Sequence, residues 1–123
     1  MRFEKLQGKA SIKKQLATYR WEKENNGTYW SGFPVHTDRE ARSAAMGEIV
    51  NIQAGLRQDG ELWKFADGIF RPLTNVEFMQ MYAAAGIFVR LCFICERMCQ
   101  IRIDAGDYHI ETIWNEEWDK LIN

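Results

Sequence analysis

The chain has 123 residues, of which 46% are hydrophobic and 27% are charged, with only two prolines. This length fits one domain, and the composition excludes collagen, low-complexity and disordered polymers. The net charge of −1 excludes a globally basic nucleic-acid binder. Four of the first ten residues are charged and none belongs to an apolar run, so no secretory signal is expected.

Charge is uneven along the chain. Residues 1–33 carry seven basic and three acidic side chains, whereas residues 105–123 carry one and five. Two interpretations stay open: solvated ends that aid solubility, or a head-to-tail assembly in which a basic arm docks on the acidic end of a neighbour.

The N-terminal part predicts an arm followed by a hairpin. Residues 1–17 are basic and weakly patterned, and they form either a loose arm or a short helix over Ser11–Tyr19. Asn26-Gly27, between two aromatic runs, predicts a β-hairpin with a type I′ turn because both turn positions need positive φ. Residues 32–34 should break its second strand.

A helix and a second hairpin follow. Thr37-Asp38-Arg39-Glu40 is a capping box, so a helix should begin there and end near residues 55–60. Its predicted buried positions are Ala41, Ala45, Ile49, Ile52 and Leu56. Asp67-Gly68 then predicts the turn of a second hairpin, which Pro72 should end.

The longest helix should run from a second capping box, Thr74-Asn75-Val76-Glu77, to about Asp104. It carries two adjacent apolar seams, each with alternating steps of four and three. The first seam is Met81, Ala85, Phe88, Cys92, Cys95 and Cys99. The second seam is Ala84, Ile87, Leu91, Ile94, Met98 and Ile101. Two seams exceed what one amphipathic face needs, so we expect another copy or another chain to cover part of this width. The alternative is that the hairpins cover the second seam within one monomer.

Residues after Gly106 predict a short acidic amphipathic helix in which Trp114 and Trp118 are the expected anchors of a docking contact. The fold class is therefore α+β: two β-hairpins packed with two main α-helices, one of them long, and a short C-terminal amphipathic helix. The expected organisation is a basic arm (1–17), one domain (18–104) and an acidic docking segment (105–123). The expected interface residues are Met81, Ala85, Phe88, Cys92, Cys95, Trp114 and Trp118.

Candidate chemistry centres on Cys92-x-x-Cys95-x-x-x-Cys99. Closely spaced thiolates can hold an iron–sulfur cluster, which leaves a metal or redox protein as an alternative function. We expect instead free, buried thiols in a reducing compartment, since helix positions bridge poorly and the flanks lack loop residues. His36 and His109 build neither a zinc site nor a catalytic triad. No catalytic residue, metal or cofactor is predicted, and the chain is not expected to be an enzyme.

Nucleic acid and membrane are also not expected as partners. The basic and aromatic residues around Arg20 and Trp30 are interleaved with Glu22 and Glu24, which spoils a nucleic-acid platform. The most apolar stretch, Ala83–Cys95, is broken by Arg90 and is too short to span a bilayer.

The order and spacing of several motifs resemble a phage and prophage domain of unknown function, found among tail fibre and fibre-assembly proteins. The resemblance covers about residues 18–104. It is carried by Arg20-Trp21, Glu24, Gly27, Gly32, Val35, Thr37-Asp38-Arg39, Trp63-Lys64, Ala66-Asp67-Gly68, Leu73-Thr74, Val89, Cys92-Phe93 and Glu96.

This resemblance implies a non-enzymatic structural component of a bacteriophage tail, at the tail fibre or baseplate used in host attachment. Such a protein would be assembled in the host cytoplasm and located in the virion. Its expected partners are itself, as a homo-oligomer with a trimer as one arrangement, and other tail proteins. A tail fibre assembly chaperone is the alternative that the same resemblance allows.

Overall fold

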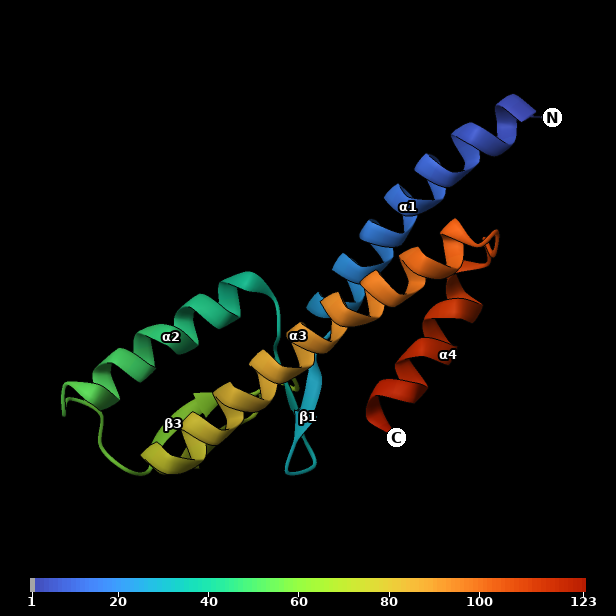
Figure 1. Cartoon of the computed structure of the whole chain (residues 1–123). Helices are drawn as coiled ribbons and strands as arrows, with labels where there is room; N and C mark the ends of the chain where they lie inside the picture. The colour runs from blue at the N-terminus through green and yellow to red at the C-terminus, as the bar shows by residue number, and fades with distance from the viewer. Residues whose placement is uncertain (1) are drawn as a thin grey trace. The chain divides into compact units, whose positions relative to one another are not determined.

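The structure, a computed structural model, describes residues 2–123, with side chains described from Gly8 onward. Four helices and two antiparallel hairpins alternate along this part of the chain (Figure 1). In order they are α1 (Arg2–Asn25), β1 (Thr28–Trp30), β2 (Phe33–Val35), α2 (Arg39–Gln53), β3 (Glu61–Lys64), β4 (Phe70–Leu73), α3 (Asn75–Asp104) and α4 (Ile110–Ile122). The predicted α+β class, with one long helix, is confirmed.

The chain divides into two compact units. The first contains residues 2–23 and 90–123, and the second contains residues 24–89. Helix α3 contributes its N-terminal half to the second unit and its C-terminal half to the first. The expected boundary between residues 17 and 18 falls inside α1. Of the two alternatives for the N-terminal residues, the loose arm is wrong, and the helix over Ser11–Tyr19 is present as part of the longer α1.

The second unit packs both hairpins against α2 and the first half of α3. Its buried core comes from β2, β4, α2, α3 and the residue after β3, and a partly buried tryptophan of β1, Trp30, packs against it. The buried members are Val35, Ala45, Phe65, Leu73, Phe78, Met81 and Ala85. Trp63 of β3 closes the cluster with its ring edge-on to Phe78, at 4.9 Å between centroids.

The turn of the first hairpin lies five residues later in the chain than the predicted Asn26-Gly27 turn. Residues 19–25 belong to α1, because Leu16, Tyr19 and Arg20 fall on one helix face at spacings of three and four. Gly27, with φ of 90°, follows the end of α1 instead of forming the hairpin turn. The turn is Ser31-Gly32, whose φ angles of 51° and 81° are both positive, as a type I′ turn requires.

Proline is tolerated in both hairpins. Pro34 pairs with Tyr29 and Pro72 with Leu62, so neither proline ends its strand as expected. A two-stranded sheet leaves each strand one unpaired edge, where a missing N–H costs nothing. The predicted Asp67-Gly68 turn of the second hairpin is confirmed.

The helix caps are partly as predicted. At α3 the capping box forms: the amide of Glu77 donates to Thr74 Oγ1 at 3.1 Å, and the amide of Thr74 donates to Glu77 Oε1 at 2.9 Å. At α2 the cap is Asp38, one residue later than predicted, and it accepts from the amide of Ala41. Of the residues predicted to form the buried face of α2, Leu56 is the exception, because it lies beyond the end of the helix and its side chain is exposed.

The hydroxyl of Thr37 does not cap α2 and instead forms buried hydrogen bonds within the second unit. It donates to the carbonyl of Glu24 at 2.6 Å and accepts from the amide of Gly27 at 2.9 Å. Glu24 is itself fully buried, and its carboxylate pairs with Arg42 at 3.0 Å. This network fastens the end of α1 to the start of α2.

The first unit is a three-helix arrangement in which the C-terminal half of α3 lies beside α1 and α4 (Figure 1). Ion pairs run along its contact with α1: Arg20 to Glu96 at 2.9 Å and Lys13 to Asp104 at 2.7 Å. Trp114 of α4 is 2% exposed and contacts Tyr19 edge-on at 5.5 Å between ring centroids.

Candidate functional site

The first apolar seam of α3 lies inside the chain's own core. Met81 and Ala85 are buried in the second unit, and Cys92 and Cys95 in the first, while Phe88 is half-buried. A partner helix cannot reach these buried side chains while the units stay folded. The assignment of these positions to a partner interface is therefore corrected.

The second seam is the one left outside. Ile87, Ile94 and Ile101 are exposed, and Ile101 keeps 54% of its surface in solvent. Ala84, Leu91 and Met98, which alternate with them, are half-buried. The excess apolar width that the sequence predicts is therefore present, but on the other seam, and the hairpins do not cover it.

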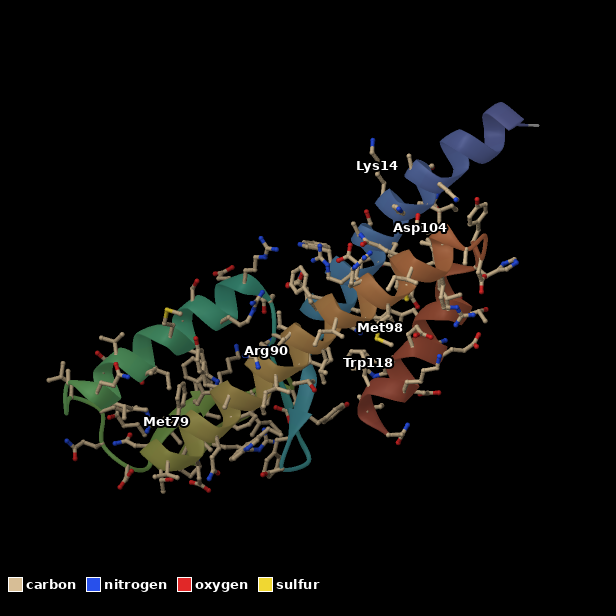
Figure 2. All side chains as sticks on the ribbon, viewed as in Figure 1. Lys14, Met79, Arg90, Met98, Asp104 and Trp118 are labelled. Carbon is tan, nitrogen blue, oxygen red and sulfur yellow. The ribbon has the colours of Figure 1, made fainter. Side chains whose placement is uncertain are left out.

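Within the first unit, this exposed surface can be defined residue by residue. It consists of Arg90, Phe93, Ile94, Arg97 and Ile101, all on α3, and we call it the outer α3 face. Steps of three and four residues connect Arg90, Ile94, Arg97 and Ile101, so these four lie along one side of the helix. Figure 2 labels Arg90 at the beginning of this stretch.

Trp114 and Trp118 do not form an outward docking pair. Trp114 is buried in the first unit, and Trp118 is half-buried and stacks on it with ring centroids 6.1 Å apart. The exposed side of α4 carries the polar residues Glu111, Asn115 and Asp119 instead. The expected role of these tryptophans as contact anchors is corrected: they hold α4 on its own unit.

The three cysteines are free and fully buried. Cys95 Sγ lies 3.6 Å from the carbonyl oxygen of Trp114, to which it donates. Its hydrogen bond with the Cys99 thiol and its burial raise the pKa of Cys95 well above the ordinary range of a thiol. A thiol in this state is a packing group and not a nucleophile.

The side chains that could bind a metal ion are scattered in the described part of the chain. Within the described residues, no group of three or more histidine, cysteine or acidic side chains is placed to hold an ion. Both histidines are exposed, and neither belongs to a cluster.

Two of the cavities among the described residues lie in the second unit. One of about 30 Å³, between α2, α3 and Trp63, has room for a single water. The other, an open hollow of about 410 Å³, is lined by Trp30, Phe33 and Arg71. The Arg71 guanidinium is 2.7 Å from Asp67 and 4.3 Å from the centre of the Phe33 ring, and its hydrogen bond lowers the pKa of Asp67. The positive charge of Arg71 in this hollow is therefore already paired with Asp67.

Arg57 is a structural residue that the sequence did not reveal. Its side chain is 2% exposed, and it donates to Asn75 Oδ1 at 2.6 Å and to the carbonyl of Leu73 at 3.2 Å. It also lies 3.3 Å from a carboxylate oxygen of Glu48 and 5.0 Å from the centre of the Phe78 ring. A buried arginine in a loop has no sequence periodicity that could have marked it.

Helix α3 is also long and apolar enough, by length and composition, to cross a membrane. Its most apolar window has a mean hydropathy of 1.7, and 33% of that window is buried within the chain. The apolar part is thus longer than the Ala83–Cys95 stretch taken from the sequence. Core helices of compact proteins meet the same criterion, and the second half of α3 forms ion pairs at Glu96, Arg102 and Asp104. That no membrane is a partner stays a prediction.

These features define a small α+β protein of two compact units, with an exposed apolar helix face as its most distinctive surface. Residues 7–117 match the family described as a domain of unknown function, DUF4376, and because that match spans most of the chain, the protein belongs to this family. Comparisons with curated proteins and with solved structures give no match.

Proposed function

We propose that this chain is a non-enzymatic structural component of a bacteriophage tail, associated with the tail fibre or baseplate, that works by contact with other proteins. The phage assignment comes from the resemblance of residues 18–104 to the tail-associated domain. The mode of action comes from the outer α3 face.

The observation that supports contact as the function is the exposure of that face. Phe93 is 44% exposed and Ile94 41% exposed, on a helix that both units share. Burial of large apolar side chains is the main driving force of protein association, at about 25 cal/mol per Å². A contiguous apolar helix face of this kind is typical of an interaction surface.

The assignment to the phage tail can be tested by looking for the chain in purified phage particles. The phage or induced prophage that encodes the chain is grown, its particles are purified, and the chain is quantified in them by mass spectrometry. A fixed copy ratio to known tail proteins supports a structural component. Absence from particles whose fibres fail to assemble without the chain supports an assembly chaperone. Absence from particles that assemble normally without it refutes both.

A pair of variants tests whether the outer α3 face is the contact. Ile94→Lys with Ile101→Lys should abolish incorporation into particles while the circular dichroism spectrum is kept, because both side chains are already exposed. The matched control is Met46→Lys, which changes an apolar side chain of similar exposure, 56%, on α2. Equal incorporation of both variants would exclude the outer α3 face as the contact.

A further inference from the structure

The charge of the outer α3 face indicates the chemistry of the partner surface that would bind to it. Its two ionic side chains, Arg90 and Arg97, are both cationic and lie seven residues apart, about 10 Å along the helix axis. In the part of the chain that the structure describes, neither guanidinium lies within 4 Å of a carboxylate. Arg97 donates to the side-chain oxygen of Gln100 at 3.3 Å.

The carboxylates of the same half of α3 are already paired inside the unit. Glu96 is held by Arg20 at 2.9 Å, and both side chains are largely buried. Asp104 is held by Lys13 at 2.7 Å, and the pairing lowers the pKa of Asp104. Between Arg90 and Ile101 the outer α3 face therefore presents two positive charges beside Phe93, Ile94 and Ile101, and the next carboxylate along the same side, Asp104, is paired with Lys13.

This distribution disfavours a second copy as the occupant. Steps of three and four place both arginines along the same side as Ile94 and Ile101. Two such faces packed in parallel would bring arginines against arginines. An antiparallel pair that avoids this would set each arginine against an isoleucine, with no carboxylate to pair it, in a contact that excludes water. Like charges at a helix interface are the usual means by which the wrong pairing is rejected.

We propose that the occupant of the outer α3 face is an acidic amphipathic helix of a different protein, with an apolar stripe and carboxylates seven residues apart. Resting on the proposed function, this names the class of tail protein that the chain would bind. The apolar stripe would cover Phe93, Ile94 and Ile101, and the two carboxylates would pair with Arg90 and Arg97. Such complementary pairs select the partner and its orientation.

The chain itself can be turned into the probe. The variant Arg90→Glu with Arg97→Glu keeps the isoleucines and carries two carboxylates seven residues apart, so its α3 has the chemistry proposed for the partner. Mass by light scattering is measured for the wild-type chain alone, for the variant alone, and for their equimolar mixture.

We expect each protein alone to have the mass of one chain and the mixture to contain a complex of twice that mass. The mixed pair should be at least about tenfold tighter than either pair of identical chains. Higher salt should weaken it, because the pairs are at a partly exposed surface. Lys14→Glu with Lys64→Glu, which makes the same change in net charge at two other exposed side chains, should form no complex with the wild type.

Three results would overturn the proposal. A monomeric mixture would show that the face does not select carboxylates. A wild-type dimer that Ile94→Lys dissociates would show that a second copy is the occupant. Binding of the wild-type chain to anionic phospholipid vesicles, lost in the double glutamate variant, would assign the face to a membrane surface. These measurements need no phage, so their failure is separate from failure of the tail assignment, which only the particle analysis tests.

Discussion

Replacing Arg57 with alanine should destabilise the second unit more than any other single change of a charged side chain there. The guanidinium sits in the loop after α2 and joins three segments: the end of α2 through Glu48, the β3–β4 hairpin through the carbonyls of Glu61 and Leu73, and the start of α3 through Asn75. Alanine would remove the guanidinium donor from Asn75 Oδ1 and from the carbonyls of Glu61 and Leu73, of which the Leu73 carbonyl keeps the amide of Gly60.

The magnitude follows from the burial of the group. Breaking a buried ion pair by removing one partner costs about 3–5 kcal/mol, because the remaining charge loses its compensation. The side chain of Glu48 is 29% exposed and can be partly rehydrated, so the lower end of this range applies, at about 3 kcal/mol. Arg57→Lys should recover about 1 kcal/mol, since one ammonium replaces the charge but cannot reach all of the acceptors.

Urea unfolding followed by tryptophan fluorescence measures the free energy, and amide hydrogen exchange at Gly60 reports the hairpin locally, because this amide donates to the carbonyl of Leu73. The control is Arg39→Ala on α2, whose side chain is 67% exposed and 4.0 Å from Glu24, and which should cost less than about 1 kcal/mol. Equal losses for the two variants would refute the role given to Arg57.

Three further predictions concern the first unit. Trp114→Ala with Trp118→Ala should unfold the packing of α4 and cost about 3–5 kcal/mol, measured by urea titration, because Trp114 is buried; loss of binding with unchanged stability would contradict this. The three buried cysteines should react with a thiol reagent in native buffer only as slowly as the unit opens, and fast labelling would revive the redox alternative. Glu117→Gln should make the melting temperature less dependent on pH in the acid range. The hydrogen bonds from Lys120 and Arg102 lower the pKa of Glu117, so the stability it provides is complete above the ordinary glutamate pKa, about 4.3, and is lost as pH falls through the lower folded value. The melting temperature of the wild type should therefore fall more steeply than that of the variant below about pH 4.3. Glu111→Gln, at an exposed position of the same helix, is the control and should follow the wild type.

The elements that could be predicted from the sequence are those whose signals are local and unambiguous. The capping box at Thr74 and the Asp67-Gly68 turn need only neighbours within a few residues, and both are where the sequence put them. Asn26-Gly27 is ambiguous, because a residue with positive φ serves equally in a hairpin turn and after a helix end. The helix is favoured by Tyr19 and Arg20, whose partners, Trp114 on α4 and Glu96 on α3, lie far away in the sequence.

The sequence predicted that α3 has an exposed apolar surface, but it did not predict which of the two seams is exposed. Periodicity along α3 gives two seams of nearly equal apolarity, and nothing local says which one α1, α4 and the hairpins cover. Small side chains such as Ala85 and Cys92 permit close approach of other elements, whereas the isoleucines of the second seam would hold them apart. Arg57 and the buried Glu24 were invisible because their partners come from several separate segments.

The discontinuous first unit has a consequence for biosynthesis. Arg20 and Glu96 are separated by 76 positions, so α1 leaves the ribosome long before the helix it packs against exists. At about 5–20 residues per second, that interval is on the order of 4–15 s. During this interval the nascent α1 lacks α3 and α4, its neighbours in the first unit, while residues 24–89 are completed shortly before Glu96. A chaperone that binds exposed helices during synthesis would therefore meet α1 first, and slower translation would lengthen the time for which α1 lacks α3 and α4.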